Sequence, residues 1–348
     1  MVAELGIVSQ RIAYLSRLPT ISQENDMASM DKMSVVAYPW GVDPVSVDDL
    51  VRFAQRAQDL GFYSVNVPYV TVAMEADAVF ASFSHNHIVD PVVVMTAMLR
   101  ETHSIRIASD GFPLSLLPPY HWAKTIATLE HMAPGRVIAG FCLGYGEKMF
   151  SAYGATLKQR ASRSNEQLEI ITRLWSDPRV DHHGKHYHLE DMTCEPKPAT
   201  APPIWWAGGE KSIGRAARYA TCLDLFLPPL EEVNTIALKL REENQRLGTE
   251  TELGSWVYTH VEATKSMTGE DIDTRFAGYY FSDERIAAPR PRDVAVAGDP
   301  RQCADKIAEY EGLGLTRFVL DFQNHGVDPV DTGIAQMELF AERVAPLL

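Results

Sequence analysis

The chain has 348 residues, 46% of them hydrophobic and 22% charged, a composition typical of a folded protein with a sizeable core. Its 32 Lys and Arg residues stand against 46 Asp and Glu residues, and the formal net charge of −14 disfavours nucleic acid and anionic membranes as partners. The apolar runs are too short to span a membrane, the N-terminus lacks a signal-peptide pattern, and the four cysteines form no C-x-x-C pair. We therefore expect a cytoplasmic protein with free thiols.

The chain divides into a weakly periodic start and a regular remainder. Residues 1–32 are predicted to be an N-terminal extension that is poorly ordered or loosely packed. From Met33 to the C-terminus, a single catalytic domain (33–348) is expected, in which short apolar runs alternate with amphipathic helices. The predicted strands are 35–38, 63–67, 105–109, 137–142, 204–207, 223–227, 256–261 and 318–322.

Helix-start signals support this alternation. Ser46 and Asp49 form a capping box, and Asp90-Pro91 and Asp299-Pro300 place proline in the first helical turn. Helices between parallel strands supply the crossovers, and eight such units predict an α/β fold, the (β/α)8 TIM barrel. An open doubly wound sheet would need a glycine fingerprint after the first strand, where Pro39-Trp40-Gly41 stands instead.

Two connections are longer than ordinary loops. They span 69–89 and 263–296, and both follow predicted strands. Long connections in a compact domain usually carry function, and the loops after barrel strands lie over the active face. We expect both to be insertions at the carboxyl-terminal face that form walls or lids of a site.

The sharpest local signal is the stretch IWWAGGEKS at 204–212. A strand runs into Gly208 and Gly209, and a helix starts shortly afterwards, so backbone amides could approach an anion such as a phosphate. Glu210, Lys211 and Ser212 complete the candidate cofactor-binding loop, with Lys211 and Ser212 as further contacts. An ordinary strand-to-helix turn is an equally good interpretation of the same residues.

A second glycine-rich stretch, GFCLGYG at 140–146, allows backbone near Gly144 to line a pocket. Cys142 within it could be a reactive thiol, although inert packing is the favoured interpretation.

The densest group of imidazoles lies at 182–188, around Gly184. No cysteine or carboxylate completes a zinc spacing there, so a solvated hairpin is expected and no metal is predicted.

Three blocks of sequence together resemble one known family. They are LEHMAPGRVIAGFCLGYG at 129–146 with FSAYG at 150–154, then YHL, PKP and PPIWWAGG between 187 and 209, and finally GDPRQCADK at 298–306. Their order and spacing resemble the bacterial luciferase-like flavin monooxygenases, and the likeness runs from Met33 to the C-terminus.

This resemblance implies a barrel that holds reduced FMN at the strand carboxyl ends. It implies that O2 adds to the flavin to give a C4a-peroxyflavin, which oxidises a small organic substrate, and that a separate flavin reductase supplies the flavin. It also suggests a homodimer. The loop at 208–212 would hold the flavin phosphate, Cys142 would lie near the flavin, and Asp110-Gly111 would form a non-proline cis peptide beneath the ring.

The chain departs from the family after the second strand. Members often carry a histidine there, whereas this chain reads Pro68-Tyr69-Val70-Thr71. General acid or base work would pass to Tyr69, to His85 or His87 in the following connection, or to no side chain. The same loss weakens an F420-dependent oxidoreductase, the main alternative, and leaves open a non-catalytic flavin-binding relative.

The substrate is not indicated. Four aromatic residues near strand ends could form an apolar wall, although bulky residues there are more often core. They are Tyr69, Phe112, Trp205 and Trp206.

Overall fold

The computed structural model describes residues 30–41, 44–71, 88–276, 289–324 and 326–348. The extension predicted over 1–32 therefore lies almost wholly outside the described residues, as do His85 and His87.

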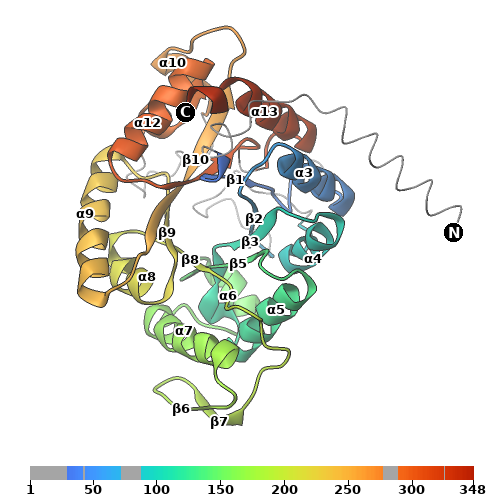
Figure 1. Ribbon diagram of the computed structural model, residues 1–348, viewed down its shortest axis with the longest axis vertical. Coiled ribbons are helices and arrows are strands. Elements are labelled where there is room, and N and C mark those ends of the chain that lie inside the picture. The colour runs from blue at the N-terminus through green and yellow to red at the C-terminus, as the bar shows by residue number, and fades with distance from the viewer. Residues whose placement is uncertain (1–29, 42–43, 72–87, 277–288, 325) are drawn as a thin grey trace, which may run out of the picture.

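The predicted barrel is confirmed as a closed ring of eight parallel strands (Figure 1). In spatial order these are β1 (Met33–Val36), β2 (Ser64–Pro68), β3 (Arg106–Asp110), β5 (Val137–Cys142), β8 (Ile204–Ala207), β9 (Cys222–Phe226), β10 (Glu252–Val261) and β12 (Arg317–Asp321). Pairing of Met33 with Phe318 joins β12 to β1 and closes the ring. Each of the eight strands predicted from apolar runs overlaps one of these.

Helices surround the ring on its outside, as Figure 1 shows. They are α3 (Val47–Asp59), α4 (Pro91–Glu101), α5 (Pro119–Met132), α7 (Arg160–Ser176), α8 (Ile213–Tyr219), α9 (Leu230–Leu247), α12 (Pro300–Gly312) and α13 (Val330–Arg343). Their starts follow the predicted signals: the Ser46 hydroxyl accepts from the Asp49 amide at 3.0 Å, and Asp299 and Gln302 form a capping box on α12.

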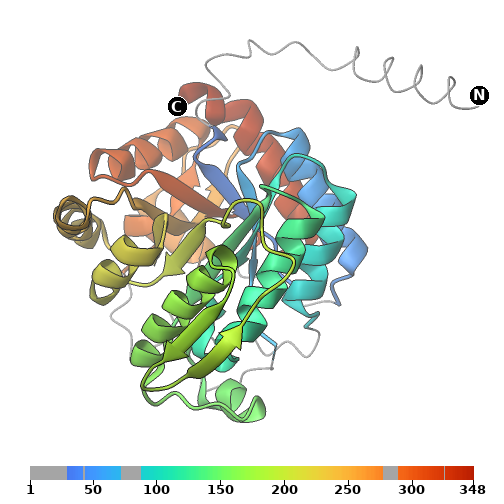
Figure 2. The ribbon, with the colours of Figure 1, turned by 60° about the horizontal axis from the view of Figure 1, so that its bottom comes forward.

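Shorter elements decorate this ring. They are β4 (Phe112–Pro113), α6 (Glu147–Ala152), β6 (Val180–His183), β7 (His188–Met192), α10 (Gly269–Arg275), α11 (Pro291–Val294) and β11 (Val296–Gly298). The antiparallel pair β6–β7 confirms the predicted hairpin and lies against α7 (Figure 2). No helix in the described ranges is long and apolar enough to cross a bilayer.

One glycine brings β3 and β5 close together beneath the site. A Cβ built on Gly140 would lie 1.9 Å from the Ser109 carbonyl oxygen, so only glycine fits there without a shift of the backbone. The Ser109 hydroxyl accepts from the Gly140 amide at 2.7 Å and donates to its carbonyl at 3.0 Å. This contact positions Asp110 and Cys142, the last residues of the two strands, side by side.

Candidate active site

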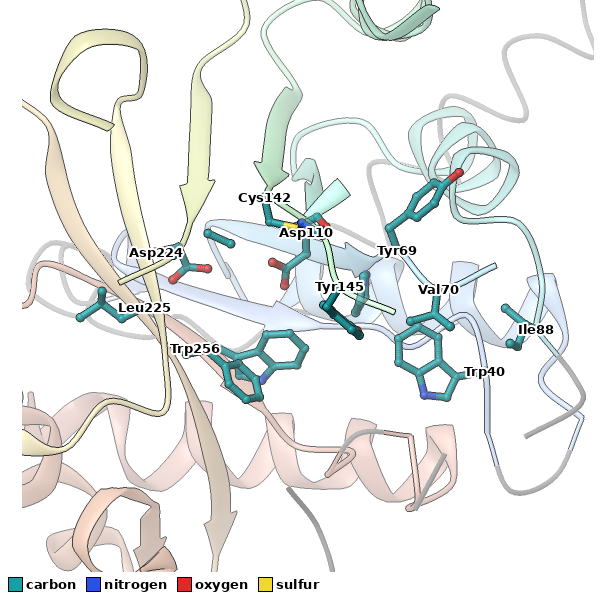
Figure 3. Close-up of a pocket in the computed structure, with 16 residues that line it drawn as sticks. Trp40, Tyr69, Val70, Ile88, Asp110, Cys142, Tyr145, Asp224, Leu225 and Trp256 are labelled. Carbon is teal, nitrogen blue, oxygen red and sulfur yellow. Dashed lines mark hydrogen bonds between the residues drawn. The ribbon is translucent and has the colours of Figure 1, made fainter. Parts of the chain in front are cut away.

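A cavity of about 290 Å³ opens at the carboxyl ends of the barrel strands (Figure 3). Because parallel strands end at one face, residues distant in sequence converge there. The lining comprises Trp40, Pro68, Tyr69, Val70, Ile88, Asp110, Gly111, Cys142, Gly144, Tyr145, Ala207, Gly208, Asp224, Leu225, Phe226 and Trp256. Six of the predicted site residues therefore meet in one place: Tyr69, Asp110, Gly111, Cys142, Gly144 and Gly208.

The turn after β3 is shaped by glycine, and the predicted cis peptide is wrong. The Asp110–Gly111 bond is not cis; in the described chain the cis bond is Glu195–Pro196. Gly111 has φ 65°, so its left-handed backbone absorbs the change of direction that the cis bond was expected to supply. Gly144 has φ 76°, and a Cβ on it would lie 2.7 Å from Cβ of Pro113. Backbone thus forms part of the cavity wall.

Cys142 lines the cavity as a thiol held by backbone. Its Sγ donates to the Gly111 carbonyl at 2.8 Å and accepts from the Gly144 amide at 3.2 Å. Burial raises the pKa of Cys142 to about 12, an effect that the Gly144 amide partly offsets. The thiolate needed for nucleophilic chemistry is therefore scarce at neutral pH, in keeping with the packing interpretation.

Tyr69 occupies the position where the family often carries histidine. It is buried, and its ring packs on Phe112 with centroids 4.5 Å apart and on Trp122 at 5.7 Å. Its hydroxyl lies 3.4 Å from that of Tyr153. Burial raises its pKa, as does the Tyr153 hydroxyl, so the phenol stays protonated and can donate a hydrogen bond.

Two carboxyl groups face the cavity, and sequence reasoning missed the second. Asp110 ends β3 and Asp224 lies in β9, and Figure 3 shows both side chains directed into the same space. Within the described residues, Asp110 Oδ2 and Asp224 Oδ1 are buried without a hydrogen-bond partner. An acidic residue inside the apolar run Leu223–Leu225 was the available signal, because a strand buried on both faces rarely carries one.

The pKa values of both carboxyls are raised. Burial raises the pKa of Asp110 to about 7; the Asn66 side chain opposes this rise and the charge of Asp321 adds to it. Burial raises the pKa of Asp224 well above its ordinary value, and the nearby Asp110 carboxylate raises it further. These shifts follow from desolvation and like-charge repulsion acting together.

The remaining walls are largely aromatic and were also missed. Trp40, Tyr145, Phe226 and Trp256 line the cavity, and the Phe226 and Trp256 rings pack edge to face with centroids 5.1 Å apart. Of the four aromatic residues proposed from sequence, Tyr69 lines the cavity, whereas Phe112, Trp205 and Trp206 do not and are buried in the core.

The predicted phosphate loop lies beside this cavity, with Gly208 on its wall. A Cβ on Gly208 would lie 2.4 Å from the Ser212 hydroxyl and 3.2 Å from Trp206 Nε1, so both polar groups lie close to the Gly208 backbone, although neither residue lines the cavity. Trp206 Nε1 is buried without a partner, which fits a missing acceptor such as a phosphate oxygen. The expected helix contribution is small, because α8 has only seven residues and follows a 3-10 turn over Glu210–Ser212.

The other predicted loop residues either contact protein groups outside the cavity or are open to contact a ligand. Glu210 pairs with Lys239 at 2.7 Å, away from the cavity lining. Lys211 is exposed, and a Cβ on Gly209 would meet nothing within 4 Å. The loop therefore offers an open backbone beside a buried indole N–H and a buried hydroxyl.

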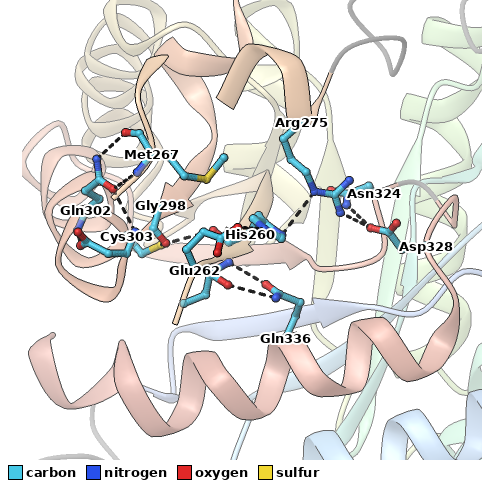
Figure 4. Close-up of polar contacts among 12 residues, drawn as sticks. His260, Glu262, Met267, Arg275, Gly298, Gln302, Cys303, Asn324, Asp328 and Gln336 are labelled. Carbon is cyan, nitrogen blue, oxygen red and sulfur yellow. Dashed lines mark hydrogen bonds and ion pairs between the residues drawn. The ribbon is translucent and has the colours of Figure 1, made fainter. Parts of the chain in front are cut away.

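The two long connections differ in their relation to the cavity. Tyr69, Val70 and Ile88 of the first line it, whereas the described residues of the second do not. Gln302 fastens the second by exchanging two hydrogen bonds of 2.9 Å with the Met267 backbone (Figure 4). Arg275 of α10 forms an ion pair with Asp328. The described part of this connection is thus tied to α12 and to the loop after β12.

The histidine hairpin is satisfied by its own contacts. His182 Nε2 lies 3.0 Å from Glu166 Oε1, His183 Nδ1 lies 2.8 Å from His188 Nε2, and His186 Nε2 lies 2.9 Å from the Ser162 hydroxyl. In the part of the chain that the structure describes, no three His, Cys, Asp or Glu side chains are grouped as metal ligands.

A barrel with a mostly apolar cavity at its strand ends, walled by glycine backbone beside a loop suited to an anion, defines a small-molecule enzyme scaffold. Residues 33–317 match the family model of luciferase-like monooxygenases, and the chain belongs to that family. Members of the family are oxidoreductases, and this chain is an enzyme of that class.

Similar sequences include F420-dependent dehydrogenases. The chain is 29% identical over 227 residues to the F420-dependent glucose-6-phosphate dehydrogenase of Kineococcus radiotolerans, covering 57% of this chain and 66% of that protein. It is 25% identical over 323 residues to the protein of the same name from Amycolatopsis mediterranei, covering 84% and 94%.

Solved structures share the fold. The monooxygenase RslO1 from Streptomyces bottropensis superposes with a TM-score of 0.75 at 20% identity, covering 90% of this chain and 99% of that one. An F420-dependent secondary alcohol dehydrogenase, in complex with an F420-acetone adduct, gives 0.72 at 19% identity, covering 91% and 98%.

Proposed function

We propose that the chain is a flavin-dependent monooxygenase that uses reduced FMN and O2 to oxidise a small organic substrate in the cavity. The observation that carries this proposal is the pairing of an aromatic cavity with the adjoining loop at 208–212. Flavins need both an apolar space for the ring and polar donors for the phosphate. A separate flavin reductase and a homodimeric assembly belong to the same proposal.

The residues present fit such a cofactor. The Trp206 indole N–H, the Ser212 hydroxyl and the open backbone at Gly209 would hold its phosphate. The glycine backbone at Gly111 and Gly144 would let the ring approach the barrel closely. Reduced FMN bound here would supply the electrons for O2 activation, while the aromatic walls keep water out.

A second candidate is an F420-dependent oxidoreductase, which the named dehydrogenase relatives favour. F420 also carries a phosphate on its tail, so the same loop would serve it. The substrate of those relatives fits less well. No Lys or Arg is among the described residues that line the cavity, whereas two carboxyls are, and a sugar phosphate needs the opposite charge. A neutral, largely apolar substrate suits these walls better.

Anaerobic titration of the protein with reduced FMN and, separately, with reduced F420 tests the proposal. Binding of FMN near micromolar concentration, with O2 consumed during turnover, is the expected result. Binding of F420 alone and turnover without O2 would overturn the monooxygenase in favour of the second candidate. Binding of neither would overturn both.

Gly209→Val tests the phosphate loop. A Cβ there meets no protein atom within 4 Å and the backbone has φ −113°, so the fold should survive while the side chain blocks the approach of a phosphate. We expect affinity for the cofactor to fall at least tenfold, with an intermediate loss for Gly209→Ala. Unchanged affinity in a folded Gly209→Val protein would refute this placement.

A further inference from the structure

The cavity floor holds two carboxyls that lack the partners a buried charge requires. Asp110 is 8% exposed and Asp224 is 4% exposed. A buried carboxylate normally accepts several hydrogen bonds or faces a cation. Here one oxygen of each is buried without a partner in the described structure, and both side chains point into the cavity.

A third buried carboxyl shows the contrast. Asp321 at the end of β12 accepts from the Tyr38 hydroxyl at 2.6 Å and from the Gln323 amide at 3.1 Å, so its charge is stabilised by hydrogen bonds. It does not line the cavity. Asp321 therefore serves the structure, and its charge acts on Asp110 through the barrel interior.

The surroundings of the pair add no positive charge. The groups that act on Asp110 are Asn66 of β2 and Asp321 of β12, and the group that acts on Asp224 is Asp110. The neighbouring titratable groups are Tyr38, Cys142 of β5 and Cys222 of β9, all neutral when protonated. With no described Lys or Arg acting on either carboxyl, two negative charges buried in one cavity cannot coexist at low cost.

We propose that Asp110 and Asp224 form a proton-sharing carboxyl pair that donates and accepts a proton on the molecule bound in the cavity. The catalytic role deepens the proposed function and rests on it. The sharing of a proton between the two carboxyls does not depend on the proposed function. The pair gives the site an acid and a base where this chain reads Pro68-Tyr69-Val70-Thr71 in place of the family's histidine. Carboxyl pairs that hold one proton between them are effective in proton transfer because their two protonation states lie close in energy.

The step moves a proton and no electrons. The O–H bond of the protonated carboxyl breaks as the proton passes to a lone pair of the substrate or product, and the pair regains a proton from solvent. In the reverse sense, the ionised member takes a proton from a substrate hydroxyl or amine. The redox chemistry stays with the cofactor.

The shared proton can be tested without a cofactor. Aspartate labelled with ¹³C at the carboxyl carbon reports each group's ionisation by NMR as pH is raised from 5 to 9. Asp110→Asn and Asp224→Asn assign the two signals. We expect the two signals of the wild-type protein to move in coupled steps, and the Asp224 signal of Asp110→Asn to titrate at lower pH than in the wild-type protein, because the Asp110 charge is gone.

A matched control is Asp305→Asn on α12, which removes an exposed aspartate paired with Arg301 and should leave the coupled titration unchanged. Signals of Asp110 and Asp224 that stay fully ionised, or that titrate independently of each other, would overturn the proton-sharing pair. Because this measurement uses the cofactor-free chain, it stands even if FMN and F420 both fail to bind.

The proton-transfer role needs a second readout. In the cofactor-loaded enzyme, either Asp→Asn change should lower kcat roughly 100-fold or more and abolish the neutral-range step in the pH profile. Cofactor Kd, measured separately, should change less than threefold. Wild-type kcat and an unchanged pH profile in both variants would overturn the role in catalysis, while loss of cofactor binding in the wild-type chain would count against the proposed function instead.

Discussion

Carboxyl groups beside the histidine hairpin and on the cavity floor differ in their hydrogen bonding. Beside the hairpin, Glu166 of α7 is 11% exposed in its side chain and accepts from His182 at 3.0 Å and from the Tyr187 amide at 2.7 Å. On the cavity floor, Asp110 and Asp224 each keep a buried oxygen without a partner in the described structure. The carboxyl beside the histidine-rich hairpin thus has its hydrogen-bond partners, whereas each carboxyl on the cavity floor lacks one among the described residues.

Opposite pKa shifts express this difference. Burial would raise the pKa of Glu166, but hydrogen bonds from His182, Tyr187 and His186 outweigh burial and lower it. For Asp110, burial wins and raises the pKa to about 7. Function is best sought where burial is uncompensated, since a satisfied group has no capacity left for a ligand.

The largest expected effect is a loss of stability with rising pH at the cavity floor. The folded pKa of Asp110, about 7, lies above the unfolded value of about 3.9, so the folded state keeps a proton that the unfolded state releases. Its contribution is complete below about pH 4 and declines by about 1.4 kcal/mol per pH unit up to about pH 7. Urea unfolding at several pH values measures it.

Asp110→Asn should remove this part of the pH dependence of unfolding free energy. The stability of the variant relative to the wild-type chain should therefore be higher at pH 7 than at pH 4. Parallel curves for the two proteins across that window would contradict a raised pKa at this position.

The next effect tests the hairpin. Glu166→Gln replaces an acceptor of several hydrogen bonds by a group that also carries donors, facing the amides of His186 and Tyr187. We expect unfolding free energy to fall by about 1–3 kcal/mol, with cofactor affinity unchanged. A variant as stable as wild type would show that the Glu166 contacts contribute little.

Cys142→Ala should cost less, about 1 kcal/mol, because it removes one thiol with its weak contacts to Gly111 and Gly144. Turnover should be retained, and alkylation of Cys142 at neutral pH should be slow, since burial raises its pKa to about 12. Complete loss of turnover in a folded Cys142→Ala protein would instead assign the thiol to the chemistry.

The smallest effect is expected at the exposed histidines. His183→Asn should change stability by no more than about 0.5 kcal/mol, because His183 is exposed and its ring contacts only His188 among the neighbouring imidazoles. Thermal unfolding of His183→Asn and Glu166→Gln, measured side by side, compares the two losses of stability. A larger loss than for Glu166→Gln would reverse the ranking of the two contacts.

Local sequence was sufficient for the barrel. Each strand is a short apolar run, and several helices carry their own start signal, as at Ser46 and Asp299, so these elements follow from interactions between residues near in the chain. The hairpin at Gly184 and the loop at Gly208 were found for the same reason. The resemblance to the luciferase-like family, carried by short blocks of sequence, was likewise readable and is confirmed.

Only the tertiary structure decided which residues face the cavity. Barrel strands are buried on both faces, so no alternation of polar and apolar residues tells the inner face from the outer one. Strand register placed Asp224 opposite Ala207 and put its carboxyl on the cavity floor, while Trp205 and Trp206 went to the core. The turn at Gly111 adopted a positive φ in place of the expected cis bond. Convergence of the strand ends depends on closure of the ring, which no local pattern encodes.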